Sequence, residues 1–416
     1  EDLMSGKDTI TYRVGLDDTD SHDGGCTTHD LNSLITLLRS EISSFEENER
    51  RLVRLWPYAE RRTRGNAALC LIATVSKRHS DDFLSILEEW VPEPGADDDR
   101  SSARPAIVVG SGVPPVNWYW DAVRSHVKLQ SRIESIGETR FKIFTKSESP
   151  HGVIGASAAV AWPVLSHTWE LVAWRNEQEI GSDRAVDPEI IGMLGERFPG
   201  TFANRDPTTG RCLVAPRTPC PVLYGIRGSN QTTVVDAHNW LQSFAEIEEA
   251  PDSAVHRTNQ CSDDHLTGTG RGTVTTTPVV GAGGHASLHV RGELGSDHLV
   301  AFKESGPVND LLRELQVGDR IGWAGMQSPE GSIHLERMIL KDPVPIIDGR
   351  PTCCGVAMKS TGRRSRLRCI RCGKLESRIW ATKQERERGS WREPLPSNRR
   401  HLAKPLDHGP PFEPTT

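Results

Sequence analysis

The residues best suited to chemistry lie together near the start of the chain. Asp17, Asp18 and Asp20 place three carboxylates within four positions, and two glycines and the threonines Thr27 and Thr28 follow shortly after. Carboxylate oxygens are the ligands that Mg²⁺ prefers, and glycines let backbone N–H groups approach an anion. The stretch therefore predicts a site that binds a metal ion and phosphate groups.

The patterns on either side indicate which elements would hold these residues. Apolar residues alternate with polar ones from Ile10 to Leu16, which is typical of a half-buried strand. From Leu31 to Ile42 apolar residues recur at helical spacing, and a helix N-terminus presents unpaired N–H groups to an anion. The alternative interpretation is an ordinary acidic turn, followed by a helix that Thr27 caps and Asp30 completes.

A basic turn further along offers more phosphate ligands. Arg62 and Arg64 precede Gly65 and Asn66, just before an apolar strand predicted at 69–75. Arginine presents a fork of N–H donors that matches phosphate oxygens. We therefore predict phosphate binding here, although a plain surface turn has the same composition.

The remaining patterns predict an alternation of strands and helices in the first 160 residues. We expect a solvated loop at 92–104. Strands are predicted at 51–55 and 107–109 and helical segments at 80–90 and 119–136, and the Gly/Ala-rich stretch 152–160 suits close packing of a turn and a helix.

Five short strands with one helix among them follow between 268 and 340. They are predicted at 273–274, 285–291, 298–302, 319–323 and 333–340, with the helix at 308–315. This order suggests an OB-fold, a common nucleic-acid-binding module. Another small β-barrel with a different ligand would show the same pattern.

Four of the nine cysteines crowd into a short segment near the C-terminus. Cys369 and Cys372 have the spacing of a zinc knuckle, whereas Cys353 and Cys354 are adjacent. Either all four thiolates bind zinc, with strain in the adjacent pair, or Cys354, Cys369 and Cys372 bind it and histidine or water completes the set. Unligated cysteines are the remaining possibility.

Composition sets broad limits on the protein. The chain has 416 residues, of which 36% are hydrophobic and 25% charged, so two to four soluble domains are expected. No apolar run approaches the ~20 residues of a membrane span, and we expect a cytoplasmic protein. The net charge is −6, yet residues 359–404 hold 15 Lys and Arg against 4 Glu, which suggests a basic arm for an anionic polymer or a solvated tail.

The motif GLDDTDS…GCTT resembles the start of the archaeal tRNA(Ile) 2-agmatinylcytidine synthetases, which read GIDDTDS…GMCTT. The likeness continues in order along the chain, in RRTRGNAA, GVIGASAAV, WELVAWR and RTNQCSDDHL. The sequence departs from the family pattern at five positions: Gly25, Trp56, Arg62, Cys261 and His334. If Cys261 replaces a glycine of positive φ, that position is strained.

The resemblance implies an ATP-dependent ligase that joins agmatine to carbon 2 of the wobble cytidine of the isoleucine tRNA with anticodon CAU. Agmatidine formed in this way enables decoding of AUA. The cytidine 2-oxo group, a poor leaving group, would first be phosphorylated and then displaced by the agmatine amine. ATP, Mg²⁺ and Zn²⁺ are the implied cofactors, and no membrane or obligate protein partner is expected.

Roles for individual residues follow from the same resemblance. Asp17, Asp18 and Asp20 would coordinate Mg²⁺, and Thr27 matches a position that is autophosphorylated in the family. The residues expected to hold ATP phosphates are Thr28, Arg62, Arg64, Gly65 and Asn66. Glu170 and Asp206 are candidates for the agmatine site, because a dication needs carboxylates, although Glu170 would also fit the exposed face of a strand.

The implied architecture is multidomain α+β. Its parts are an N-terminal α/β kinase-like catalytic domain (9–112), a ferredoxin-like α+β domain for agmatine and tRNA (113–250), an OB-fold β-barrel (265–345), a C-terminal zinc ribbon (350–376) and a basic, disordered tail (377–416).

Two other classes of function share some of these features. A non-catalytic protein that binds tRNA or single-stranded nucleic acid would use the OB-fold and ribbon and keep the acidic stretch as structure. A phosphotransferase acting on a small molecule would turn over ATP without RNA.

Overall fold

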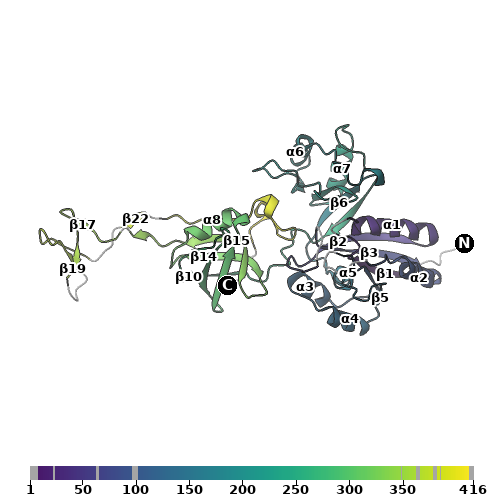
Figure 1. Ribbon diagram of the computed structural model, residues 1–416, viewed down its shortest axis with the longest axis horizontal. Helices are drawn as coiled ribbons and strands as arrows, with labels where there is room; N and C mark the ends of the chain where they lie inside the picture. Colours follow the sequence, from purple (N-terminus) through teal and green to yellow (C-terminus); the bar gives the residue numbers. More distant parts are fainter. Residues whose placement is uncertain are drawn as a thin grey trace. The chain divides into compact units, whose positions relative to one another are not determined.

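The computed structural model describes residues 8–21, 24–61, 65–95, 102–347, 349–361, 366–377, 382–384 and 386–411. The chain forms two compact units, Glu1–Leu266 with Leu395–Gly409, and Thr267–Pro394 with Pro410–Thr416. The first unit mixes strands and helices, and the second is mostly β (Figure 1). The prediction of a multidomain α+β protein is confirmed. None of the described helices has the length and apolar character that crossing a bilayer requires.

A nine-stranded sheet forms the centre of the first unit. Its order is β5-β4-β1-β3-β2-β9-β6-β8-β7. The strands are β1 (Thr9–Asp17), β2 (Glu46–Arg54), β3 (Ala67–Ser76), β4 (Ala106–Ser111), β5 (Lys142–Phe144), β6 (Thr168–Trp174), β7 (Thr201–Phe202), β8 (Val222–Gly228) and β9 (Asp252–Thr258). Because β9 pairs with β2 on one side and β6 on the other, it joins two halves built from separate stretches of sequence.

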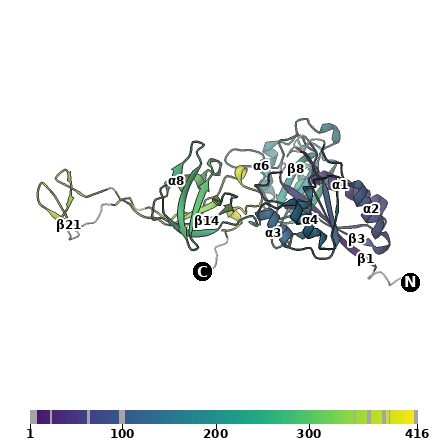
Figure 2. The ribbon, with the colours of Figure 1, turned by 60° about the horizontal axis from the view of Figure 1, so that its bottom comes forward.

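Helices cover this sheet in three groups, as Figures 1 and 2 show. They are α1 (Thr27–Glu41), α2 (Ser80–Trp90), α3 (Asn117–Arg124), α4 (Leu129–Gly137), α5 (Gly152–Ala161), α6 (Pro188–Arg197) and α7 (Gln231–Leu241). The first two share one hydrophobic cluster with β1 and β3, whereas α3, α4 and α5 belong to another. A third cluster joins α6 and α7 to β6 and β8. Buried apolar side chains of helix and strand therefore account for the layers, although the sequence patterns did not predict α6, α7 or β9.

One predicted helical stretch is interrupted. The pattern from Tyr119 to Ile136 predicted helical spacing throughout, but α3 ends at Arg124 and α4 begins at Leu129. Ser125, which follows α3, has extended backbone angles. The apolar positions match helical spacing in both pieces because both pack on α5.

The second unit contains a closed barrel. The sheet has six strands in the order β10-β14-β15-β13-β12-β11; a further pairing of β10 with β12 closes five of them into the barrel, and β11 pairs with β12 alone. The six strands are β10 (Gly270–Val274), β11 (Val279–Val280), β12 (Ala286–Gly292), β13 (Ser296–Ala301), β14 (Arg320–Gln327) and β15 (Ile333–Asp342), with α8 (Pro307–Glu314) between β13 and β14. The five predicted strands and the helix are present, and the short, exposed β11 was not predicted.

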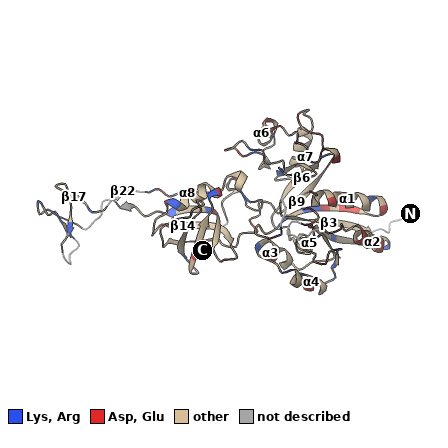
Figure 3. Cartoon of the chain, in the orientation of Figure 1, with Lys and Arg blue, Asp and Glu red and all other residues tan. Residues whose placement is uncertain are grey.

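A small β module follows the barrel within the second unit. Short hairpins carry the cysteines, and Figure 3 marks Lys and Arg of the chain in blue. Its strands are β16 (Ile346–Ile347), β17 (Thr352–Cys353), β18 (Val356–Ala357), β19 (Lys359–Ser360), β20 (Arg366–Arg368), β21 (Leu375–Ser377) and β22 (Thr382–Gln384).

The C-terminal segment differs from the prediction of disorder beyond Gly389. Residues 395–409 return to the first unit, where Leu402 and Ala403 are buried. The carbonyl oxygens of His401 and Leu402 accept hydrogen bonds from the N–H groups of Cys261 and Asp263, at 3.0 and 2.9 Å. The Pro- and Arg-rich composition favoured disorder, but the segment also contains two apolar residues that become buried. One of them, Leu402, joins a hydrophobic cluster formed by residues from much earlier in the chain.

Candidate active site

The acidic stretch forms the turn between β1 and α1. Asp17 ends β1, and Asp18 and Gly25 have positive φ of 58° and 79°. Glycine therefore suits position 25, where the family usually has methionine. The three carboxylates of Asp17, Asp18 and Asp20 line one cavity of about 340 Å³. The structure brings together the three residues that the sequence proposed for a metal site.

Burial and mutual repulsion disfavour ionisation of these acids. Burial raises the pKa of Asp17 well above its usual value, and the neighbouring Asp18 carboxylate adds to the effect. Burial also raises the pKa of Asp18 to about 7; the Arg61 guanidinium opposes this and the Asp20 carboxylate adds to it. Crowded carboxylates of this kind need a cation to be ionised together, and their oxygens are the donors that Mg²⁺ accepts.

Helix α5 sets the position of Asp17 through its glycines. A Cβ on Gly155 would overlap the Asp17 carboxylate, and one on Gly152 would lie 2.5 Å from the Asp17 carbonyl oxygen. Helix and loop can approach this closely only because both positions lack a side chain. The Gly/Ala-rich stretch 152–160, predicted to allow close packing, thus forms one wall of the acidic cavity.

The threonines at the start of α1 face both the acids and the sheet. Thr27 is buried, and its Oγ1 donates to Asp20 Oδ1 at 3.4 Å. Thr28 Oγ1 accepts from Trp174 Nε1 at 3.1 Å. The residue that caps α1 is Cys26, which makes no side-chain capping bond. The alternative in which Thr27 caps the helix therefore does not hold.

The basic turn is described only in part. Arg62 and Arg64 lie outside the described residues. The Gly65 carbonyl accepts from Arg54 Nη1 at 3.0 Å, and Asn66, with φ of 41°, donates from Nδ2 to the Trp56 carbonyl at 2.7 Å. Asn66 therefore has a defined position at the edge of the acidic cavity.

A larger cavity of about 480 Å³ adjoins the first. Asp20, Asn66 and Ala67 line both cavities, so the acids and the second space share a boundary. Thr27, Thr28 and Gly65 also line the larger one. A phosphoryl group bound beside the acids would thus lie next to room for a second reactant.

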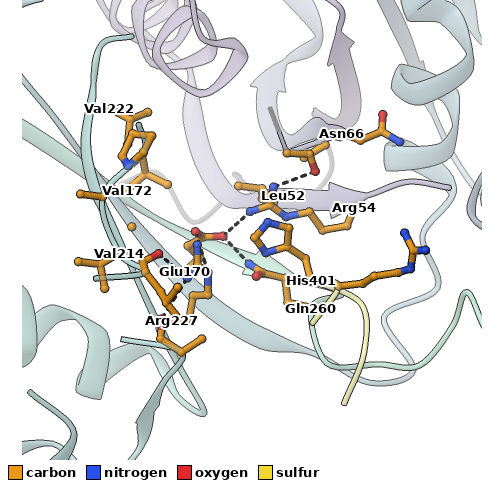
Figure 4. Close-up of a pocket in the computed structure, with 18 of the residues that line it drawn as sticks. Leu52, Arg54, Asn66, Glu170, Val172, Val214, Val222, Arg227, Gln260 and His401 are labelled. Atoms are coloured by element: carbon orange, nitrogen blue, oxygen red, sulfur yellow. Dashed lines mark hydrogen bonds and ion pairs between the residues drawn. The ribbon is translucent and has the colours of Figure 1, made fainter. Parts of the chain in front are cut away.

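Glu170 lies at the centre of an ion-pair cluster in the larger cavity (Figure 4). Its Oε2 accepts from Arg54 Nη2 at 3.0 Å and from Gln260 Nε2, and its Oε1 pairs with Arg227 Nε at 3.4 Å. A Cβ on Gly225 would lie 2.6 Å from Oε1, so glycine leaves space for the carboxylate.

Glu170 is 3% exposed, which excludes the alternative of an exposed strand face. Burial disfavours its charged form, but the guanidinium groups of Arg227 and Arg54 outweigh burial and hold the pKa of Glu170 below its usual value. Sequence reasoning missed Arg54, Arg227 and Gln260, because they come from three separate strands or strand ends. Gln260 lies in the quoted motif RTNQCSDDHL, whereas no local signal marked Arg54 or Arg227.

Asp206, the second candidate for the amine, has a different environment. Its carboxylate accepts from the backbone N–H groups of Thr208 and Ser397, at 2.9 and 3.1 Å, and from Thr209. It is fully buried and lines neither cavity described above. The structure does not bring it together with Glu170.

The four C-terminal cysteines converge. Their Sγ atoms all lie within 4.8 Å of one another, with 3.5 Å between Cys353 and Cys372 and 3.9 Å between Cys353 and Cys354. Thiolates arranged tetrahedrally around zinc at ~2.3 Å would be about 3.8 Å apart. Cys354 and Gly355 have positive φ of 52° and 74°, which turns the chain so that both adjacent thiols face Cys369 and Cys372. The donor set therefore fits zinc.

Two family models match the first unit. One described as the TiaS TCKD domain matches residues 13–145, and one described as the TiaS FLD domain matches residues 150–265.

Curated relatives match nearly the whole chain. A tRNA(Ile) 2-agmatinylcytidine synthetase TiaS of Cenarchaeum symbiosum is 31% identical over 94% of this chain and 91% of the relative. The synthetase of the same name from Archaeoglobus fulgidus is 30% identical over 94% of this chain and 96% of its own.

Solved structures show the same fold. A crystal structure of TiaS in complex with an isoleucine tRNA and ATP matches with a TM-score of 0.82 and 28% identity, covering 96% of this chain and 98% of that chain. A complex of TiaS with an isoleucine tRNA, AMPCPP and agmatine matches with a TM-score of 0.81 and 25% identity over the same shares.

Proposed function

Because this chain belongs to the tRNA(Ile) 2-agmatinylcytidine synthetase family, we propose that it joins agmatine to carbon 2 of the wobble cytidine of isoleucine tRNA. The tRNA is the one with anticodon CAU, and ATP is consumed. The observation that carries the proposal is the set of three crowded carboxylates beside a second cavity large enough for a base. Non-catalytic nucleic-acid binding would require neither.

The chemistry has two steps in this proposal. The 2-oxo oxygen of cytidine attacks the γ-phosphorus of ATP, and ADP leaves. The agmatine nitrogen then attacks carbon 2, the bond from carbon 2 to the phosphorylated oxygen breaks, and phosphate leaves while the nitrogen loses a proton. The wobble base must leave its stack to reach such a site.

Asp17, Asp18 and Asp20 are proposed to hold Mg²⁺. When bound, the ion neutralises charge on the phosphoryl oxygens. The carboxylates themselves fix where phosphoryl transfer occurs, because the overlap that a side chain on Gly155 would cause shows how little room Asp17 has to move. The hydrogen bond between Thr27 and Asp20 supports Thr27 as a phosphoryl acceptor, since it brings the hydroxyl to the acids.

The phosphates of ATP are assigned to the turn between β2 and β3. Asn66 borders both cavities and Gly65 lines the larger one, which supports a role for both. Thr28 is included because it lines the larger cavity beside Thr27. Arg62 and Arg64 are retained from the family motif alone.

Agmatine is the least constrained reactant. Glu170 remains a candidate for its binding, but two guanidinium groups already neutralise this carboxylate. Asp206 is supported less, because backbone N–H groups occupy its oxygens. The carboxylate that both cavities share, Asp20, is the better placed to meet the amine.

The parts of the chain are proposed to divide the work along the predicted boundaries. The kinase-like part (9–112) would carry phosphoryl transfer, the ferredoxin-like part (113–250) amine and tRNA contacts, and the OB-fold (265–345) tRNA backbone contacts. The converging cysteines support a zinc ribbon at 350–376.

The test is incorporation of labelled agmatine into the CAU isoleucine tRNA with ATP and Mg²⁺. Asp18→Asn should lower the rate at least ~100-fold, because positioning and charge neutralisation dominate phosphoryl transfer. Asp236→Asn, on α7 and away from both cavities, is the matched control and should retain the wild-type rate. Tight tRNA binding by the wild type without any incorporation would refute the ligase assignment.

A further inference from the structure

The larger cavity carries a strong excess of positive charge. Among the described residues, two acids line it, Asp20 and Glu170. Six arginines line it with them: Arg54, Arg211, Arg217, Arg227, Arg399 and Arg400. Because Glu170 already pairs with Arg54 and Arg227, the charge of the other arginines attracts an anion to their side of the cavity.

In two of these arginines the Nε atom is buried and donates no hydrogen bond among the described residues. Arg54 is 8% exposed, and its Nε is buried without a hydrogen-bond acceptor among the described residues. The Nε of Arg227 is likewise buried without a hydrogen-bond acceptor there, although it pairs electrostatically with Glu170. Buried donors normally find a partner, so the described residues leave these two guanidinium groups beside the cavity incompletely satisfied.

The C-terminal segment forms part of this wall. Residues between Pro396 and Pro405 line the cavity, and Figure 4 shows His401 beside Arg54 and Gln260. The guanidinium of Arg400 lies over the Tyr58 ring at 5.2 Å. The Ser397 N–H donates a hydrogen bond to the Asp206 carboxylate at 3.1 Å, so Asp206 anchors the C-terminal segment. Residues 396–405 come after the long stretch Thr267–Pro394 of the second unit, and the cavity is incomplete without them.

We propose that this arginine-rich wall, completed by the C-terminal segment, binds phosphate groups of the tRNA that flank the wobble nucleotide. The proposal rests on the proposed function and extends it to a specific surface. An RNA nucleotide brings a negative phosphate on each side of its base, and arginine matches phosphate oxygens with paired donors. ATP also carries phosphates, and Gly65 and Thr28, which are assigned to them, line the same cavity. Substitution of Arg399 and Arg400 separates the two anions, because the KM for ATP reports on one and the tRNA affinity on the other.

The test measures the tRNA dissociation constant across a series of salt concentrations. Arg399→Ala/Arg400→Ala should weaken tRNA binding about tenfold near 0.15 M salt. The slope of log affinity against log salt should lose about 1.4, since each single-strand phosphate contact contributes roughly 0.7. The KM for ATP should stay unchanged. Arg39→Ala/Arg197→Ala, at exposed positions of α1 and α6, removes the same charge away from the cavity and should leave the slope unaltered.

The charge-preserving Arg399→Lys/Arg400→Lys variant covers the case in which the alanine variant does not fold, and it should restore most of the salt slope. Unchanged tRNA affinity and slope in a folded alanine variant would overturn the proposal. A raised KM for ATP with unchanged tRNA affinity would also overturn it, because the phosphates would then be those of ATP. Failure of the proposed function is distinct, since it shows as absent agmatine incorporation by the wild type.

Discussion

Single side chains determine how close the reactive groups come. Asp17 occupies space that exists because position 155 is glycine, and Glu170 does the same opposite Gly225. In each case a carboxylate packs closely against a glycine of a neighbouring element. Cys261 shows the opposite situation, because a residue with a side chain has a positive φ of 60° there. A cysteine with positive φ is strained, so position 261 is strained in this chain. The N–H of Cys261 nevertheless donates a hydrogen bond to the C-terminal segment.

Gly155→Ala should abolish most of the activity without unfolding the protein. The added Cβ would overlap the Asp17 carboxylate and displace it, and a shift of about 1 Å can cost ~100-fold in rate. Gly137→Ala, at the end of α4 where nothing lies within 4 Å of a new Cβ, is the matched control. Agmatine incorporation and thermal unfolding of both variants provide the measurement. Full activity of Gly155→Ala would show that the position of Asp17 is not critical.

Among the elements, β9 has the largest structural consequence. It pairs parallel with β2 and antiparallel with β6, and this places Gln260, just beyond its end, against Glu170. Asn259 continues the connection, accepting from the Arg54 N–H at 2.7 Å and donating to the Tyr119 hydroxyl at 2.9 Å. A strand near the end of the first unit therefore positions an arginine of its second strand.

His256 on β9 makes this junction sensitive to acid. It is fully buried, and burial, followed by the Arg50 guanidinium, lowers its pKa to about 4. The unfolded chain has the higher pKa, ~6.5, so it binds more protons below that pH. The stabilisation that neutral, buried His256 gives to the folded state is therefore complete above pH ~6.5 and declines as the pH falls towards 4.

At pH 5 the contribution of His256 to the free energy of unfolding should be lower by about 2 kcal/mol than at pH 8. Urea unfolding at both pH values checks this in the wild type and in His256→Gln and His256→Leu. Both variants should lose about 2 kcal/mol less than the wild type between the two pH values. If all three proteins lose the same amount, the ionisation of His256 does not contribute.

At the scale of the whole molecule, the chain leaves the first unit, builds the barrel and the cysteine module, and returns. Leu395–Gly409 belongs to the first unit although Thr267–Pro394 belongs to the second. The cavity beside Glu170 and the cysteine cluster thus lie in different units, and a change in one can be measured apart from the other.

Zinc content should depend on all four converging thiols. Protein purified with added zinc should hold about one ion per chain, and Cys353→Ser, Cys354→Ser and Cys372→Ser should each lose most of it. Cys212→Ser, outside the cluster, should keep it. Atomic emission spectroscopy gives the measurement. Retention of zinc by Cys353→Ser alone would favour the three-cysteine alternative, with histidine or water as fourth ligand.

Local patterns in the sequence were enough to predict several elements, the family and the acidic site. The elements β1, α2 and α8 follow from periodicity over a few residues, and Asp17, Asp18 and Asp20 are neighbours in the chain and therefore in space. The motif around these aspartates, followed in order by the other motifs, was specific enough to identify the family to which the relatives belong.

Contacts between distant residues could not be predicted in this way, because they depend on how the elements pack. Arg54 and Glu170 are 116 positions apart, and Glu170 and Gln260 are 90 apart. Their contact depends on the order of strands in the sheet, which short-range patterns do not encode. The same holds for Leu402, whose burial needs a hydrophobic cluster formed by residues far earlier in the chain, from Val53 to Val164. Pattern predicts what each segment is, and the packing of the nine-stranded sheet decides what each segment faces.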